Sequence, residues 1–264
     1  MELKITKTRF RTLFAAAVST LIAVYGAQAQ DKVLNLYSAR HYSTDEALYT
    51  NFTKATGIKI NRLEGGEDQL LQRIKSEGAN SPADVFLTVD AGRLWLADQE
   101  GVFAPVQSKV LNERIPAAYR LASNTWYGLS SRARVMVVDK LKVKPGEITS
   151  YEDLADPKWK GQVCTRSGSH VYMLSLISSI IEHAGAEKAE AWAKGVVANL
   201  ARPPKGGDTD QVKAVAAGEC AVALSNSYYL ARMIKSDKAD DRTAMERVRV
   251  VWPNTNGRGV HMNV

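Results

Sequence analysis

The chain has 264 residues, 45% of them hydrophobic, and a formal net charge of +7. When residues 1–29 are set aside as a predicted export signal, 31 Lys and Arg remain against 27 Asp and Glu, so the excess of positive charge is small. No dense basic run and no basic stripe with interleaved aromatic residues occurs, which argues against a nucleic-acid-binding protein. The remaining length permits one large or two medium domains.

The N-terminal residues predict an exported protein. A basic start ends at Arg11, residues 13–25 are apolar, and Ala27-Gln28-Ala29 supplies the small-x-small pattern of a secretory cleavage site. We expect cleavage after Ala29. No later run approaches the roughly 20 apolar residues that a membrane span needs. No cysteine follows the cleavage site to carry a lipid anchor, so the mature chain is expected to be free in the periplasm of a diderm bacterium.

Short β-like runs alternate with amphipathic helical windows, which is typical of an α/β protein with mostly parallel sheets. In the first region the pattern predicts strands at 33–37, 58–63 and 83–89, and helices from Ser43 to the stop at Gly57, at 67–77 and at 94–99. After a β-branched run at 134–138, it predicts helices at 173–184, 187–198, 210–217 and 228–235, and strands at 221–224 and 248–252.

These elements predict two lobes joined by a hinge. The strands at 134–138 and 248–252 would carry the chain out of the first lobe and back to it. The expected boundaries are 30–133 for the N-terminal lobe, 134–250 for the C-terminal lobe and 251–264 for the return to the first lobe. Because residues 260–264 alternate apolar side chains without a closing helix or polar tail, we expect the natural protein to continue past Val264.

The only two cysteines are Cys164 and Cys220. Exported proteins meet an oxidising compartment, so a disulfide is the plain interpretation. The alternative, a catalytic thiol beside a histidine, finds no recognisable nucleophile motif around either residue.

Tyrosines follow several predicted strands. Tyr228 and Tyr229 come directly after the run that ends at Asn226-Ser227, Tyr172 lies where a small polar loop enters a helix, and His41-Tyr42 follows the first strand. Parallel α/β sheets place their ligand sites at these carboxyl ends. A phenol that loses its proton becomes a hard anionic oxygen, the kind of ligand that ferric iron prefers to sulfur. The pattern therefore indicates an exported iron-binding protein.

The chain resembles a known family, the periplasmic ferric-ion-binding proteins of ABC importers, in its tyrosine-rich subgroup. The segments that carry the resemblance follow in chain order: Tyr37 to Tyr42, Ala83 to Asp90, Ser131 to Val135, Trp159-Lys160-Gly161, and Asn226 to Tyr229. They cover nearly all of the mature chain, and the double tyrosine after an asparagine is the most specific of them.

The resemblance implies a two-lobed periplasmic solute-binding protein of type II, with mixed sheets flanked by helices and a hinge of crossing strands. It further implies a monomer that binds Fe(3+) in the interdomain cleft and delivers it to an ABC-type inner-membrane permease. The implied ligands are Tyr42, Tyr172, Tyr228 and Tyr229, with His41 as a fifth donor or a close neighbour.

Two further expectations concern the charge around the metal. Several phenolates overbalance a trivalent cation. Arg132 and Arg134 lie on one face of a predicted strand by their period-two spacing, and one of them, Arg132 in the first place, is expected to offset that excess from outside the ligand sphere. Other members of the family place a glutamate where this chain has Val89-Asp90. Those members often add a bound carbonate or phosphate, and here phenolates are expected to fill the same positions.

Other functions fit less well. An enzyme is disfavoured because the sequence contains no zinc-protease, nucleophile-elbow or phosphate-loop motif. A binding protein of the same architecture for an anion, a polyamine or an organic cation is the remaining alternative. Anions would call for helix N-termini and arginines, and organic cations for aromatic boxes with carboxylates. Neither demand explains a tyrosine doublet beside His-Tyr.

Overall fold

The computed structural model describes residues 32–40, 42, 44–254 and 256–264, which form two compact units that divide between Leu87 and Thr88. The predicted export signal at 1–29 and the predicted ligand His41 lie outside the described residues. The lobe boundaries predicted from the sequence, 30–133, 134–250 and 251–264, stay a prediction.

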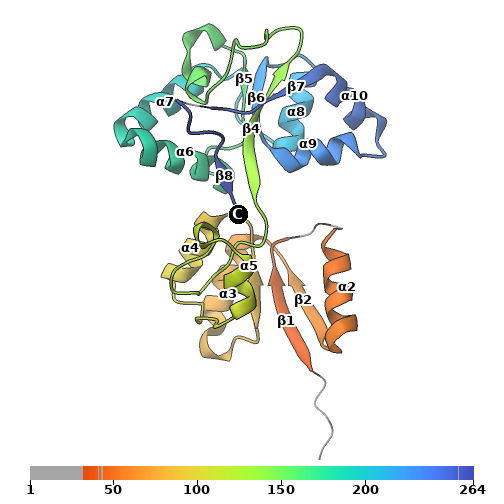
Figure 1. The fold of residues 1–264 in the computed structure, drawn as a ribbon. Coiled ribbons are helices and arrows are strands. Elements are labelled where there is room, and N and C mark those ends of the chain that lie inside the picture. Colours follow the sequence, from red (N-terminus) through yellow and green to blue (C-terminus); the bar gives the residue numbers. More distant parts are fainter. Residues whose placement is uncertain (1–31, 41, 43, 255) are drawn as a thin grey trace, which may run out of the picture. The chain divides into compact units, whose positions relative to one another are not determined.

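The first unit is a small parallel α/β structure. Its elements are β1 (Val33–Ser38), α2 (Asp45–Thr56), β2 (Lys59–Glu64), α3 (Glu67–Glu77), a 3-10 turn at Gly78–Asn80, and β3 (Val85–Leu87). The strands form a sheet in the order β2-β1-β3, and both pairings are parallel, as the sequence predicts (Figure 1). Gly57 ends α2 with a φ of 70°, a left-handed conformation that glycine adopts at little cost.

The second unit holds the remaining elements. The helices are α4 (Ala91–Gln99), α5 (Lys109–Arg114), α6 (Val171–Ala184), α7 (Ala186–Ala198), α8 (Asp208–Ala216), α9 (Ser227–Ile234) and α10 (Ala239–Arg247), with 3-10 turns at Ala117–Tyr119, Glu152–Ala155 and Pro157–Trp159. The strands are β4 (Arg132–Asp139), β5 (Val163–Cys164), β6 (Val222–Asn226), β7 (Val248–Val251) and β8 (Met262–Asn263). The sequence pattern missed α5, α10 and the two-residue strand β5.

The sheet of the second unit is mixed. Its order is β5-β6-β4-β7, with β8 also paired to β4. Strand β4 is antiparallel to β6, β7 and β8, and only β5 and β6 run parallel. The expectation of mostly parallel sheets is therefore wrong for this unit, because alternation of side chains predicts a strand without fixing the direction of its partner.

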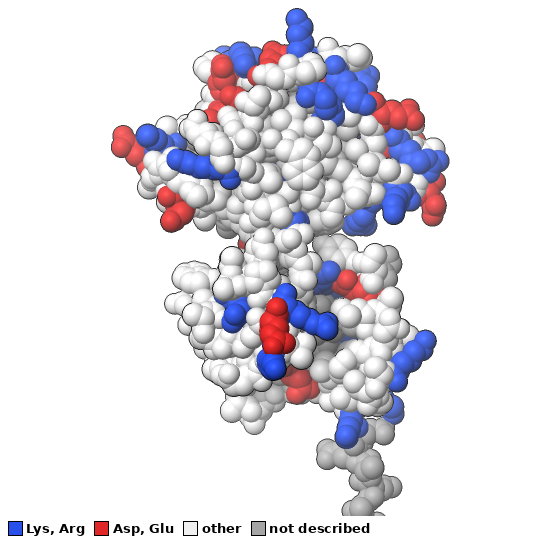
Figure 2. All heavy atoms as spheres, in the orientation of Figure 1, with Lys and Arg blue, Asp and Glu red and all other residues white. Residues whose placement is uncertain are grey.

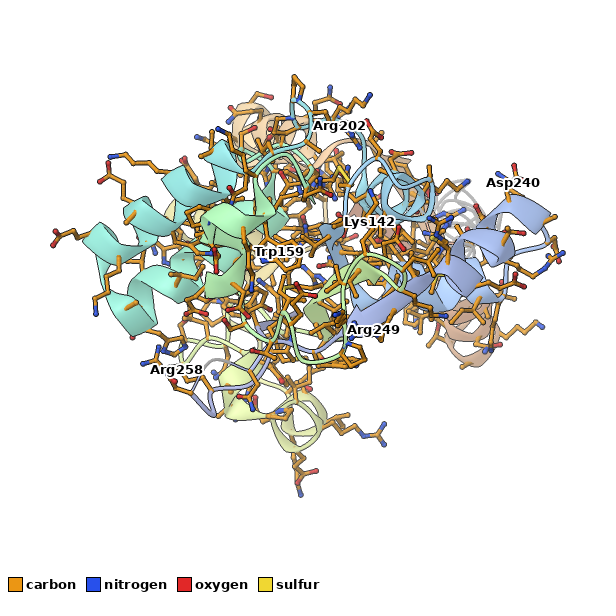
Figure 3. All side chains as sticks on the ribbon, turned by 90° about the horizontal axis from the view of Figure 1, so that it is seen from above. Lys142, Trp159, Arg202, Asp240, Arg249 and Arg258 are labelled. Atoms are coloured by element: carbon orange, nitrogen blue, oxygen red, sulfur yellow. A yellow bond between two sulfur atoms is a disulfide. The ribbon has the colours of Figure 1, made fainter. Side chains whose placement is uncertain are left out.

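Helices cover both faces of this sheet (Figure 1). Alternate residues of β4 point to opposite faces. Met136 and Val138 join the apolar core that holds Leu176 of α6 and Trp192 of α7. On the other face, the neighbouring valines of β4 join the core that α8, α9 and α10 complete. Trp159, labelled in Figure 3, belongs to the first of these cores and is 5% exposed.

The surface of the second unit carries both signs of charge. Around the part that bears α6 to α10, the face shown in Figure 2 has Lys and Arg interspersed with Asp and Glu. Among the helices of the described residues, none combines the length and apolar character that crossing a bilayer requires.

Candidate metal centre

Two parallel strands of the second unit lead to the tyrosines. In the β5–β6 pair, Val163 lies opposite Val222 and Cys164 opposite Ala223, so the carboxyl ends of both strands meet at one edge of the sheet. Beyond β5 the chain passes through a polar loop into α6, whose second residue is Tyr172. Beyond β6 it passes directly into α9, whose second and third residues are Tyr228 and Tyr229.

Local hydrogen bonds fix the start of both helices. His170 caps α6, because its Nδ1 accepts from the backbone N–H of Tyr172 at 3.2 Å and its ring packs edge-on against the Tyr172 ring, with centroids 4.6 Å apart. At the start of α9, the backbone N–H of Asn226 donates to the carboxylate of Asp208 at 2.7 Å. A polar side chain thus holds the start of each tyrosine-bearing helix, His170 for α6 and the buried Asp208 for α9.

The three tyrosines of this unit converge. The hydroxyl oxygens of Tyr172 and Tyr228 lie 3.2 Å apart and form a hydrogen bond. The rings of Tyr228 and Tyr229 are stacked, with centroids 4.3 Å apart and an interplanar angle of 29°. Tyr172 is buried and forms a small apolar cluster with Val89 and Val171. The ring of Tyr229 packs against this cluster.

The protein environment keeps the phenol of Tyr228 protonated when no cation is bound. Burial raises the pKa of Tyr228 far above the usual value, and the neighbouring hydroxyl of Tyr172 raises that pKa further. A phenolate beside a second phenolate would be strongly disfavoured here on its own. A multivalent cation reverses that balance, because its charge stabilises the anionic oxygens.

Guanidinium groups surround Tyr172. The Cζ atoms of Arg166, Arg132 and Arg134 lie 4.9, 5.3 and 5.9 Å from the centroid of its ring. Arg132 also forms an ion pair with Asp90, with 3.2 Å between Nη2 and Oδ2. Arg132 therefore stands beside one of the predicted ligands. Asp90 is engaged by that arginine.

Tyr42 belongs to the first unit, and the guanidinium group of Arg40 lies over its ring. The Cζ of Arg40 lies 4.9 Å from the centroid of the Tyr42 ring. Arg40 in turn binds the carboxylate of Asp45 through two hydrogen bonds of 2.9 and 3.1 Å. The structure thus brings together three of the four predicted tyrosine ligands in the second unit, and Tyr42 stays a predicted ligand.

The predicted disulfide is confirmed. Cys164 and Cys220 are bonded, with 5.9 Å between their Cα atoms. Two cations labelled in Figure 3 hold the turn that carries Cys220: Nζ of Lys142 donates to the carbonyl of Gly218 at 2.7 Å, and Arg202 forms an ion pair with Glu219 at 2.9 Å. The bond ties the end of β5 to the residues just before β6, the two strands that lead to the tyrosines.

Ligands of other kinds do not cluster in the described part of the chain, where no group of three or more His, Cys, Asp or Glu is placed to hold a metal ion. Within that part, the converging phenols are the oxygen donors that a cation could use. Reasoning from the sequence missed Arg166 and Asp208. Arg166 follows strand β5, whose two residues are too few to show any periodicity. Asp208 resembles the acidic residues that commonly occur in the first turn of a helix.

Comparison with known proteins places the chain in a family. Residues 80–258 match the model of the bacterial extracellular solute-binding proteins. Iron uptake protein A1 of Synechocystis is 51% identical over 235 residues, which cover 89% of this chain and 65% of that protein. The chain thus spans just under two thirds of the length of this relative.

Solved structures agree with this placement. A Trichodesmium protein in complex with iron and citrate ligands is 56% identical, with a TM-score of 0.83 over 88% of this chain and 73% of that chain. The ferric binding protein from Campylobacter jejuni is 40% identical, with a TM-score of 0.84 over 88% and 73%. The predicted resemblance and the predicted mixed α/β fold are confirmed, and the relatives are binding proteins rather than enzymes. The chain belongs to the family of bacterial extracellular solute-binding proteins.

Proposed function

We propose that this protein binds ferric iron through the phenolate oxygens of Tyr172, Tyr228 and Tyr229 and delivers it to an ABC-type permease for iron uptake. Tyr42 and His41, from the first unit, are the further ligands expected from the sequence. The observation that carries the proposal is the convergence in the second unit, where the Tyr172 and Tyr228 hydroxyls lie 3.2 Å apart and Tyr229 stacks on Tyr228.

The chemistry of the site supports a hard, highly charged cation. Phenolates are hard donors that suit ferric iron. Several of them around one metal leave excess negative charge, and the guanidinium groups of Arg132, Arg134 and Arg166 stand close enough to Tyr172 to offset it. The names of the relatives support the same cargo, since one is an iron uptake protein and another a ferric binding protein.

The visible spectrum tests iron binding. Phenolate bound to ferric iron absorbs visible light by charge transfer, so the protein mixed with a ferric chelate should turn red to purple. The double substitution Tyr228→Phe with Tyr229→Phe should abolish the colour. Tyr127→Phe is the control, because the Tyr127 hydroxyl donates to the carbonyl of Val106 and Tyr127 is not among the proposed ligands, so its loss should leave the band unchanged. A colourless wild-type mixture that retains no iron on gel filtration would overturn the proposal.

Growth under iron limitation tests delivery to the permease. Cells that lack the protein should regain ferric-iron uptake when they are given the wild-type gene and should not regain it with the variant that lacks the Tyr228 and Tyr229 hydroxyls. Equal uptake with both versions would contradict the transport role while leaving the spectrum to decide the binding role.

A further inference from the structure

A fully buried carboxylate accepts hydrogen bonds from residues that lie next to the tyrosines in space or in sequence. Asp208, the first residue of α8, is 0% exposed. Its Oδ2 accepts from Nη1 of Arg134 at 2.5 Å and from the backbone N–H of Asn226 at 2.7 Å. Its Oδ1 accepts from Nη1 of Arg166 at 3.1 Å. One side chain thus satisfies three donors.

These three donors come from different parts of the fold. Arg134 lies on β4, Arg166 lies in the loop between β5 and α6, and Asn226 ends β6 where α9 begins. Arg134 also donates to Oδ1 of Asn226 at 3.2 Å, which closes the network. Asp208 therefore connects the loop that leads to one ligand helix with the residue that immediately precedes the other.

Both arginines that Asp208 holds lie over the ring of Tyr172, at 4.9 Å for Arg166 and 5.9 Å for Arg134. Asn226 precedes Tyr228 by two residues and sets where α9 starts. The carboxylate thus fixes the cations beside one phenol and the backbone beneath the other. Without the Asp208 carboxylate, the guanidinium groups of Arg134 and Arg166 would lie close together without their shared counter-charge. The free-energy cost of that arrangement is larger than the stabilisation that either ion pair provides.

The cluster also places positive charge beside Tyr172. One carboxylate faces two guanidinium groups, which leaves a net positive charge beside Tyr172, whereas Arg132 and Asp90 offset each other. This positive charge lies where several phenolate ligands would bring an excess of negative charge to a trivalent metal ion.

We propose that Asp208 is a positioning residue for ferric-iron binding, which holds Arg134 and Arg166 against Tyr172 and fixes the start of the helix that carries Tyr228 and Tyr229. This proposal rests on the proposed function. It predicts that Asp208 acts on the metal through other residues and does not touch it, as outer partners of metal ligands do in other sites.

The test compares three variants of the whole protein. Asp208→Asn removes the charge that holds the arginines, and Arg166→Gln removes one arginine with less disturbance, because its side chain is 12% exposed. Asp139→Asn is the matched control. Asp139 is also 0% exposed and paired with an arginine, Arg247, at 3.3 Å, but it lies at the opposite end of β4 from Arg134.

The readouts are the ferric affinity, measured by competition with citrate, and the position of the charge-transfer band. Asp208→Asn and Arg166→Gln are each expected to weaken ferric binding by about 10-fold to 100-fold and to shift the band. Asp139→Asn should leave both readouts at the wild-type values even where it lowers thermal stability. A purely structural Asp208 would change stability without moving the band.

The outcomes separate the two proposals. Wild-type protein without colour or bound iron would overturn the proposed function, and the positioning role with it. Coloured wild-type protein with unchanged affinity and band in Asp208→Asn would overturn the positioning role alone. If Asp208→Asn does not fold, Arg166→Gln decides: a weakened affinity with a shifted band supports the role, and wild-type values for both contradict it.

Discussion

The hydroxyl groups of Tyr172 and Tyr228 show how residue type and position together define a site. The sequence places both residues at the start of helices that follow strands, and this position allowed them to be predicted as ligands before any coordinates. The sequence did not reveal the charged residues that support these tyrosines, Arg166 and Asp208. Arg166 and Asp208 become recognisable only when β5 pairs with β6 and brings their segments together.

The single substitution Tyr172→Phe tests the site at the residue scale. It removes one phenol and keeps the buried ring, so we expect ferric affinity to fall by about 100-fold or more, since a ligand matters at least as much as its outer partners. The stability of the iron-free protein should change by no more than about 1 kcal/mol, the size of one hydrogen bond. Citrate competition and urea unfolding measure the two quantities, and unchanged affinity would remove Tyr172 from the ligand set.

His261 makes the stability of the second unit depend on pH. The pKa of His261 is lowered to about 4, mainly by burial and in second place by the nearby charge of Arg134. The unfolded chain, with a histidine pKa near 6.5, then binds more protons than the folded chain between about pH 6.5 and 4. The contribution of the neutral His261 is therefore present above pH 6.5 and lost as the pH falls towards 4.

We expect the free energy of unfolding to fall by on the order of 2 kcal/mol across this range because of His261. The variant His261→Gln keeps a polar side chain without the titration and should show a shallower loss. Urea unfolding at several pH values measures the difference. Parallel curves for the two proteins would show that His261 does not titrate in this way.

Among the elements of the second unit, the disulfide links strand β5 to the residues just before β6. The pairing of Cys164 with Cys220 was predictable from their number and the expected compartment. The short strand β5 was not predictable, because two residues show no alternation and their pairing with β6 depends on tertiary contacts.

Removal of the disulfide should destabilise the second unit. The bond closes a loop of 56 residues, and the chain-entropy relation gives a contribution of about 4 kcal/mol for a loop of this length. The double variant Cys164→Ala with Cys220→Ala is expected to lose roughly that amount in urea unfolding without reductant. Wild-type protein in reductant should lose a similar amount once the bond is reduced. A loss below about 1 kcal/mol in both would contradict this estimate.

Helix α7 packs closely against the 3-10 turn at Glu152–Ala155, and Gly195 permits that approach. A Cβ added at Gly195 would lie 2.7 Å from the Cβ of Ala155 and 3.0 Å from its carbonyl oxygen. On an exposed helix, replacing Gly by Ala stabilises by up to about 1 kcal/mol. Here the crowding dominates, and Gly195→Ala should destabilise by about 1–3 kcal/mol. An increase in the urea midpoint would show that the turn moves away freely.

At the scale of the whole molecule, the alternation of strands and helices was sufficient to predict an α/β protein, and the succession of elements in the first unit follows the prediction closely. The alternation alone predicted mostly parallel strands, which is wrong for the second sheet, whereas the family resemblance implied the mixed sheets that the structure has. Strand β4 pairs antiparallel with β6, β7 and β8, and nothing in the alternation of its own residues distinguishes that pairing from a parallel one.

Iron binding should release protons and weaken in acid. Burial keeps the phenol of Tyr228 protonated in the iron-free protein, so the metal must displace the proton to bind the oxygen. The logarithm of ferric affinity should therefore rise with pH, with a slope that approaches the number of phenols that ionise. Competition with a chelator between about pH 5.5 and 7.5, together with proton release in unbuffered solution, measures this slope. An affinity independent of pH would show that the ligands are not phenols.

The most direct measurement is an anomalous-scattering crystal structure of the protein loaded with ferric citrate, with data collected on both sides of the iron absorption edge. We expect a single strong iron peak in contact with the hydroxyl oxygens of Tyr172, Tyr228 and Tyr229. An iron peak remote from these three oxygens, or crystals that take up no iron while the same oxygens stay hydrogen-bonded to one another, would contradict it.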